Sequence, residues 1–168
     1  SAFISDVCSR WEEAARPAED AGIRTVSLRI GVVLTPRGGA LARLLATSAL
    51  GFNSRFGDGR QYISWIGLHD AIGALLHALV CKELQGPVNI VAPEPVTNRE
   101  LLATLARVMR RPLLPPVPAA VLRLMFGQMG TEVLLDSCRA SAAKLLASGY
   151  RFRHPDLFAA LSTLLGRA

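Results

Sequence analysis

The chain has 168 residues, of which 51% are hydrophobic and 19% are charged, values that suit one globular unit with a buried core. Its apolar runs, such as residues 71–81, stop well short of the about 20 residues that span a bilayer, so neither a transmembrane helix nor a membrane partner is expected. The N-terminal residues show neither the basic start nor the apolar segment of a secretory signal. A cytoplasmic location is therefore expected.

The formal net charge of +6 comes mainly from arginines that are scattered singly along the chain. A nucleic-acid-binding surface needs a basic stripe with stacking aromatic residues, and pairs such as Arg110 and Arg111 are too short to make one. We therefore expect no nucleic-acid partner. The cysteines are odd in number and widely spaced among apolar residues, which predicts reduced, buried thiols and no metal site. They are Cys8, Cys81 and Cys138.

Helix and strand patterns alternate in the N-terminal part of the chain. Apolar residues recur three or four apart from Phe3 to Ala21, which predicts an amphipathic helix that Pro17 kinks or restarts. Residues 23–34 then alternate apolar and polar side chains between a glycine and a proline, which predicts a strand. After a glycine turn, residues 40–50 are predicted to be helical.

The middle of the chain, residues 57–71, combines a glycine-rich turn, a short strand over residues 61–65 and the start of a helix that continues to about residue 82. Strand, tight turn and helix are the layout of a ligand site in an α/β protein. Residues 88–91 are predicted to form another short, buried strand.

The C-terminal part differs in texture. Thr97 and Glu100 have the spacing of a capping box, which predicts a helix start ahead of an apolar run. The prolines between residues 112 and 118 predict a linker. Short helices are predicted beyond it over residues 119–126, 132–135, 140–146 and 156–165. The expected fold class is therefore α/β, with a body of residues 1–117 and a small α-rich C-terminal cap of residues 118–168.

Candidate chemistry gathers in the central stretch. The Gly-x-Gly at Gly57 to Gly59 precedes a strand and lacks the third glycine of a dinucleotide fingerprint, which favours a turn over cofactor binding. Arg60 beside this turn is either an anion hook for a phosphate or carboxylate or simply an exposed arginine. Tyr62 and Trp65 either line a pocket or pack in the core, with neither alternative favoured.

The next helix start offers a second candidate. His69 and Asp70 suit an acid/base pair, although adjacent residues at a helix start more often cap the helix, and capping is favoured. His77, on an apolar helix face, is predicted to be a core or edge residue. The sequence contains no P-loop, zinc-binding helix or nucleophile elbow, and no residue is predicted to be catalytic or to bind a metal.

Several motifs together resemble a known family. They are Val26 to Leu34 (VSLRIGVVL), Trp65 to Ala71 (WIGLHDA), GPVNIVAP at residues 86–93 and VTNREL at residues 96–101. They resemble the C-terminal half of extended short-chain dehydrogenase/reductases, the NAD(P)-dependent sugar epimerase/dehydratase-like proteins. Residues 7–12, residues 38–41 and the tail from about residue 118 resemble more narrowly an epimerase-like subgroup with a small C-terminal domain of unknown function.

The resemblance implies a partial Rossmann-like fold, in which a missing N-terminal half binds NAD(P) and this segment shapes the substrate pocket. Carried over by position, Arg29, Gly31 and Val32 are implied to lie near the nicotinamide half of the cofactor. The residues implied to face a small-molecule substrate, for example a sugar nucleotide, are Arg60, Trp65 and His69. No cofactor is expected to bind this segment alone, and homo-oligomerisation is left open.

One departure from the family divides the functional expectations. The family's acid/base signature is Tyr-x-x-x-Lys, in which the lysine lowers the pKa of the tyrosine, but Val7 and Trp11 fall where that motif is expected. In one hypothesis the chain is the substrate-side segment of an NAD(P)-dependent nucleoside-diphosphate-sugar epimerase or oxidoreductase, of unknown substrate and inactive alone. In the other it belongs to a non-catalytic cofactor-sensing or protein-interaction module, in line with a cell-division-inhibitor label within the subgroup.

Overall fold

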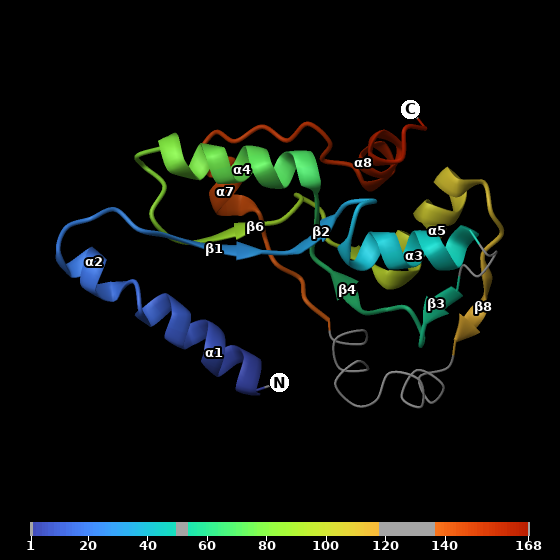
Figure 1. Cartoon of the computed structure of the whole chain (residues 1–168), viewed down its shortest axis with the longest axis horizontal. Coiled ribbons are helices and arrows are strands. Elements are labelled where there is room, and N and C mark those ends of the chain that lie inside the picture. The colour runs from blue at the N-terminus through green and yellow to red at the C-terminus, as the bar shows by residue number, and fades with distance from the viewer. Residues whose placement is uncertain (1, 50–53, 118–136, 168) are drawn as a thin grey trace.

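The computed structural model describes residues 2–49, 54–117 and 137–167. Its helices are α1 (Ala2–Glu13), α2 (Arg16–Asp20), α3 (Gly39–Ala49), α4 (Leu68–Val80), α5 (Asn98–Met109), α7 (Ala143–Ala147) and α8 (Leu157–Leu164). Its strands are β1 (Val26–Ile30), β2 (Val32–Leu34), β3 (Ser54–Phe56), β4 (Tyr62–Ile63), β5 (Trp65–Gly67), β6 (Gly86–Ile90), β7 (Val96–Thr97) and β8 (Leu114–Val117). In Figure 1, β1, β2 and β6 run along the middle of the molecule, with α4 above them. The predicted α/β class is confirmed.

Most of the strand pairs are parallel. β1 pairs with β6 from Val26, opposite Gly86, to Ile30, opposite Ile90. β2 pairs with β5, and β3 with β8, also in parallel, whereas β4 and β7 are antiparallel. Helix α4 connects β5 to β6, and parallel strands joined through helices are the arrangement expected of an α/β sheet.

The predicted strand over residues 23–34 is divided at Gly31. The Gly31 N–H donates to the Ile90 carbonyl at 3.1 Å, but the next N–H, of Val32, donates to the Ser64 carbonyl at 2.8 Å. On the far side of β5, the Ala92 N–H donates to the Trp65 carbonyl at 2.6 Å. The chain therefore separates from β6 at Gly31 and continues as β2 beside β5. Strand β5 lies between β2 and the segment that follows β6.

The two edges of the β1–β6 pair differ. Beside β6, the Lys144 ammonium donates to the Gln85 carbonyl at 2.6 Å and to the Pro87 carbonyl at 3.0 Å, and the Asn89 side chain donates to the Ser141 carbonyl at 3.1 Å. Within the part of the chain that the structure describes, the outer edge of β1 has no strand partner. The C-terminal segment therefore covers one edge and leaves the other open.

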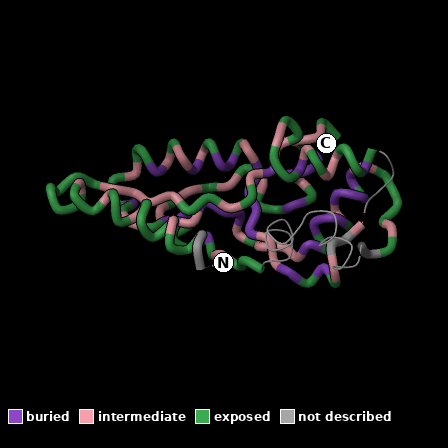
Figure 2. Tube along the Cα trace, turned by 60° about the horizontal axis from the view of Figure 1, so that its bottom comes forward, coloured by how far each residue is buried: buried purple, intermediate pink, exposed green. Residues whose placement is uncertain are grey.

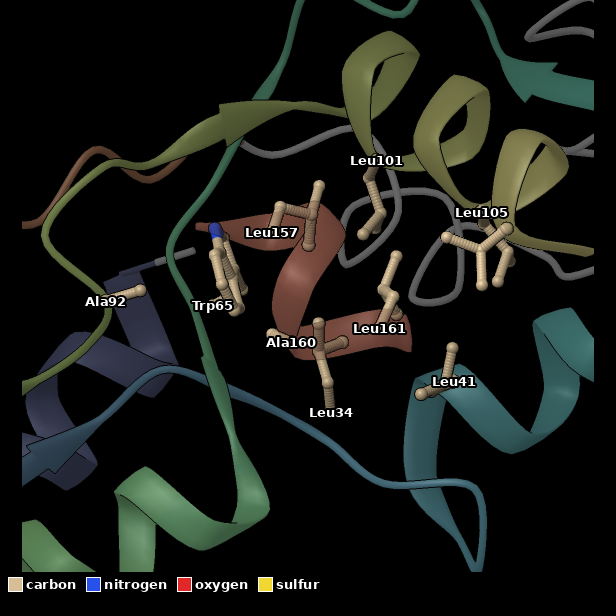
Figure 3. Packing of buried hydrophobic residues seen from close by; sticks show 10 residues of the cluster. Leu34, Leu41, Trp65, Ala92, Leu101, Leu105, Leu157, Ala160 and Leu161 are labelled. Carbon is tan, nitrogen blue, oxygen red and sulfur yellow. The ribbon is translucent and has the colours of Figure 1, made fainter. Parts of the chain in front are cut away.

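Two clusters of buried side chains form the core. The first joins β2, α3, β5, α5 and α8 through Leu34, Leu41, Trp65, Ala92, Leu101, Leu105, Val108, Leu157, Ala160 and Leu161 (Figure 3). The second joins β5, α4, β6 and α7 through Ile66, Ala71, Ala74, Ala78, Leu84, Val88, Ile90 and Leu145. Helices α7 and α8 thus pack into the same clusters as the body, and the boundary at residues 117/118 stays a prediction.

The N-terminal helices lie outside these clusters. The predicted helix is interrupted before Pro17, which occupies the first turn of α2, where its missing N–H leaves no bond unmade. From residue 5 to residue 21 no side chain is buried, and Figure 2 shows how burial varies along the chain. Trp11 is 75% exposed. The predicted helical pattern is therefore present, but none of its side chains from residue 5 onward is buried.

Two predictions concern the segment from residue 97 to residue 118, a capping box and a linker. The capping box is confirmed, because the Thr97 hydroxyl accepts from the Glu100 N–H and the Glu100 carboxylate accepts from the Thr97 N–H. The predicted linker is wrong, since Leu114 to Val117 form β8. Prolines are tolerated in a strand at the edge of a sheet, where the absent donors are not needed. Helices predicted over residues 119–126 and 132–135 lie outside the described residues.

The cysteine prediction needs correction. Cys8 and Cys138 are exposed and Cys81 is half-buried, although all are free thiols. Cys8 lies on α1, which packs against little of the described chain, and Cys138 lies in an extended segment on the surface.

Within the described ranges, no helix is long and apolar enough to span a bilayer. The cytoplasmic location stays a prediction.

The close approach at Gly31 gives a test of the strand arrangement. In Gly31→Ala the new Cβ would lie 2.5 Å from the Ser64 carbonyl oxygen and 2.8 Å from Val91 Cγ1. We expect the free energy of unfolding to fall by about 3 kcal/mol, because the carbonyl cannot move without disturbing the pairing of β2 with β5. Urea denaturation measures the change. In the control Gly38→Ala, nothing lies within 4 Å of the new Cβ, and an equal loss in both variants would contradict the arrangement.

Candidate functional site

The residues implied to lie near the cofactor occupy the point where β1 and β2 meet. Arg29 forms a two-point ion pair with Glu12 of α1, with N–O distances of 2.6 and 2.7 Å. Hydrogen bonding in this pair lowers the pKa of Glu12 and raises the pKa of Arg29. Gly31 leaves no room for a Cβ beside the Ser64 carbonyl, and the apolar Ile30 and Val32 on either side of it are 50% and 39% exposed. The junction therefore presents an apolar surface next to a paired arginine.

The glycine-rich turn before β4 is held by hydrogen bonds of its own. Gly57 and Gly59 have positive φ angles of 60° and 74°, as tight turns require. The backbone N–H of Arg60 already donates to the Asp58 carboxylate at 3.0 Å, so it is not available to a phosphate. The Gly59 carbonyl accepts from the Arg99 N–H at 3.0 Å, which fastens the turn to the start of α5. The predicted preference for a turn agrees with this geometry.

Arg60 extends from this turn into solvent. Its side chain is 89% exposed, and its nearest charged partner, Asp58, is 3.9 Å away and 70% exposed. An ion pair of this length between exposed side chains contributes little to stability. The guanidinium is therefore available to an anionic group, which keeps both sequence alternatives for Arg60 open.

Trp65 is buried in the first core cluster. Figure 3 shows its side chain among the residues of that cluster. It is 1% exposed, and its indole N–H donates to the Glu94 carbonyl at 3.0 Å. Of the two alternatives, packing is therefore the one that its position favours, and its implied contact with substrate stays a prediction. Tyr62 is half-buried, with the Arg139 guanidinium 5.1 Å from its ring centre.

Ser64 was not singled out in the sequence, yet it anchors the C-terminal segment. Its hydroxyl donates to the Cys138 carbonyl at 2.8 Å and accepts from the Ala140 N–H at 2.8 Å. Next to it, the Tyr62 N–H donates to the Ser137 hydroxyl at 3.0 Å. A serine among the apolar residues of a short strand is a weak signal, because its partners lie more than seventy residues away in the chain.

Asp70 has neither of the roles considered from the sequence. The N-cap of α4 is Gly67, and no side chain caps the helix. Asp70 is 2% exposed, and its carboxylate accepts from the backbone N–H groups of Arg153, at 2.7 Å, and His154, at 3.0 Å. His69 is exposed in the first turn of α4. The pair is therefore divided, with the aspartate binding the chain and the histidine facing solvent.

Tyr150 completes the contacts of Asp70. Its hydroxyl donates to the Asp70 carbonyl at 2.9 Å and lies 3.3 Å from the carboxylate. Burial, followed by the charge of Asp70, raises the pKa of Tyr150 to about 12. His77 lies beside this ring, with its Nε2 2.9 Å from the Ser148 hydroxyl, and is half-buried as an edge residue. These groups hold the C-terminal segment against α4.

In the described residues no group of three or more His, Cys, Asp or Glu side chains has the geometry to hold a metal ion. Of the site residues implied by the family resemblance, Arg29, Gly31 and Val32 lie together at the junction of β1 and β2. Arg60 and His69 are exposed, on either side of β4 and β5 in the chain, whereas Trp65 of β5 is buried.

Comparison with known proteins places this arrangement in a class. Residues 117–164 match a family described as a domain of unknown function, DUF1731. An epimerase family protein of Mycobacterium bovis is 41% identical over 159 residues, which cover 95% of this chain and 53% of that protein. The crystal structure of the human epimerase family protein SDR39U1 with NADPH has a TM-score of 0.81 at 35% identity, covering 87% of this chain and 50% of that one.

A third similar protein carries a more specific name. The crystal structure of the nucleoside-diphosphate sugar epimerase from Corynebacterium glutamicum has a TM-score of 0.75 at 34% identity, covering 98% of this chain and 31% of that one. The chain spans about half the length of the curated relatives it matches. The fold and its relatives are thus those of extended short-chain dehydrogenase/reductases. This chain corresponds to about half of the epimerase family proteins that it matches, and its own residues 117–164 match the domain of unknown function.

The Asp70 contacts predict a specific loss of stability. Asp70→Asn replaces one acceptor oxygen by an amide that cannot accept from the Arg153 or His154 N–H, and we expect a loss of about 2 kcal/mol in the free energy of unfolding. Chemical denaturation measures it. The exposed Asp6→Asn is the control with the same change of charge, and similar losses in the two variants would contradict the role of Asp70.

The raised pKa of Tyr150 predicts a decline of stability at alkaline pH. Between the ordinary tyrosine pKa of about 10 and the folded value of about 12, the unfolded chain loses this proton while the folded chain keeps it. The folded state then binds more protons, so the free energy of unfolding falls as the pH rises through this range. Denaturation across these pH values should show a shallower decline in Tyr150→Phe than in the wild type. A decline that Tyr150→Phe leaves unaltered would contradict the assignment.

Proposed function

We propose that this chain is the substrate-side part of an NAD(P)-dependent epimerase or oxidoreductase that acts on a nucleoside-diphosphate sugar. The observation that carries the proposal is the parting of β1 and β6 at Gly31. In parallel α/β sheets, ligands bind beyond the carboxyl ends of the strands, at the point where neighbouring strands diverge. The junction of Arg29, Gly31 and Val32 lies at that point.

The open edge of β1 is where the rest of the binding site is expected to join. Polar backbone groups along an exposed strand edge favour pairing with another strand. The half-exposed Ile30 and Val32 and the uncovered N-terminal helices supply apolar surface beside this edge. We propose that the partner is an N-terminal Rossmann half of the same protein, which would hold the dinucleotide, since the turn at Gly57 to Gly59 does not fit a pyrophosphate.

Arg60 and His69 are the proposed contacts to the substrate. A guanidinium binds a phosphate through paired hydrogen bonds, which suits the diphosphate of a sugar nucleotide. The exposed His69 would offer a polar ring to the same ligand. The buried Trp65 would act indirectly, by holding β5 in position. The name of the Corynebacterium glutamicum relative supports this class of substrate.

A non-catalytic, cofactor-sensing protein is the second candidate. In α1, Val7 is half-buried and Trp11 exposed at the positions where the family places its tyrosine and lysine. Neither side chain can exchange a proton with a substrate. Binding of NADPH without turnover of any nucleoside-diphosphate sugar would favour this second candidate.

The first experiment is calorimetric titration of NADPH into the natural protein, with its length established from its gene and intact mass, and into this 168-residue chain. We expect only a longer protein that supplies the Rossmann half to bind. Binding by the 168-residue chain with the same affinity would contradict the proposal that the dinucleotide is held elsewhere.

Arg60→Ala in the full-length protein tests the substrate side. We expect the affinity for UDP-glucose to fall about tenfold, the loss typical of one charge-assisted contact, while NADPH binding and the melting temperature stay unchanged. The exposed Arg37→Ala carries the same loss of charge and should bind both ligands like the wild type. Equal effects of the two variants on UDP-glucose would contradict a specific role for Arg60.

A further inference from the structure

A pocket of about 440 Å³ lies between α8 and the C-terminal end of α5, apart from the junction described above. Figure 1 shows both helices at the opposite end of the molecule from α1 and α2. The pocket is lined by Arg107, Val108, Arg110, Phe158, Ser162 and Arg167. Its volume falls within the range of small-molecule sites, and half of its lining residues are arginines.

Among the described residues, no carboxylate neutralises the guanidinium groups of this pocket. Across residues 2–49, 54–117 and 137–167, no acidic side chain forms an ion pair with Arg107, Arg110 or Arg167. Arg107 instead lies over the Phe158 ring, 4.2 Å from its centre, and Arg167 donates to the Val108 carbonyl at 3.3 Å. These two contacts orient the side chains without cancelling their charge, so the pocket has a strongly positive lining.

The backbone of Arg110 adopts a left-handed conformation, which residues other than glycine rarely adopt. Its φ of 52° and ψ of 45° are left-handed, and it is the one residue other than glycine with positive φ in the described chain. The Arg110 and Arg111 N–H groups bond to carbonyls of the last turn of α5, which is the turn that glycine normally closes. A side chain here strains the backbone, so the turn itself does not account for an arginine.

Helix α8 ends in the same kind of turn with the preferred residue. Gly166, with a φ of 62°, takes the left-handed position, and the Arg167 N–H donates to the Ser162 carbonyl at 2.8 Å. Arginines near helix ends also offset the negative pole of the helix. That effect does not need the left-handed position, because Arg107 in the last turn of α5 already supplies it. The presence of an arginine at this strained position is better explained by the pocket that its side chain lines.

We infer that this pocket binds a small polyanion, a molecule with two or more phosphate or carboxylate groups. Guanidinium groups bind such groups through paired, charge-assisted hydrogen bonds, and several of them around one hollow favour ligands with more than one anionic group. The ring of Phe158 beneath Arg107 holds one of them in position. This inference does not depend on the proposed function, since the pocket includes none of the residues assigned to cofactor or substrate.

The test uses Arg110→Gly, a variant that removes the guanidinium and relieves the backbone strain together. Tripolyphosphate is titrated by calorimetry into the wild-type protein at constant, physiological ionic strength. We expect binding to the wild type, about tenfold weaker binding to Arg110→Gly, and a melting temperature in that variant that is unchanged or higher. A gain in stability together with a loss of binding separates a ligand-binding role from a structural one.

Arg111→Ala is the matched control, because Arg111 is exposed, adjacent and outside the pocket lining, and its loss changes the net charge by the same amount. It should bind tripolyphosphate like the wild type. Equal weakening in both variants would show a general attraction to a basic surface and would overturn the inference, as would the absence of binding to the wild type at millimolar tripolyphosphate. NADPH titration of the same variants reports separately on the proposed function.

Discussion

The contact between Gly31 and the Ser64 carbonyl is the constraint on which the arrangement of strands depends. A residue without a side chain lets the two backbones approach closely, and the chain can then exchange β6 for β5 as its neighbour within a single residue. The divergence of the strands, the half-exposed Ile30 and Val32 and the position of the candidate site all follow from that exchange. A larger residue here would force β2 and β5 apart, and the surface beside them would lose its shape.

A second constraint acts at the other end of β5. The buried carboxylate of Asp70 receives backbone donors from residues 153 and 154, and the hydroxyl of Tyr150 closes over Gly73 of α4. Since a buried charge is tolerated only when hydrogen bonds surround it, the aspartate binds the C-terminal segment tightly to α4. Asp70 therefore holds the framework, and the groups left for a ligand are the exposed Arg60 and His69.

The sequence predicted what local chemistry decides and missed what distant contacts decide. Pro17, the capping box of Thr97 and Glu100, and the helices of α4 and α8 follow from rules that act within a few residues. The division of the strand at Gly31 depends on a carbonyl more than thirty residues away. The role of Asp70 depends on donors about eighty residues away, and β8 depends on pairing that two prolines disguise. For the candidate site, the sequence located the region, but burial separated Trp65 from the exposed Arg60 and His69.

The first core cluster also has a consequence for how the chain folds. Leu34 and Trp65 pack against Leu157 and Leu161, which are more than ninety residues further along the chain. During synthesis, the early strands must wait for α8 to leave the ribosome before this cluster can close, and their apolar faces stay uncovered in the meantime. Contacts so distant in sequence also slow the search for the folded state. We therefore expect that premature termination before α8 would direct the nascent chain towards aggregation or chaperone binding.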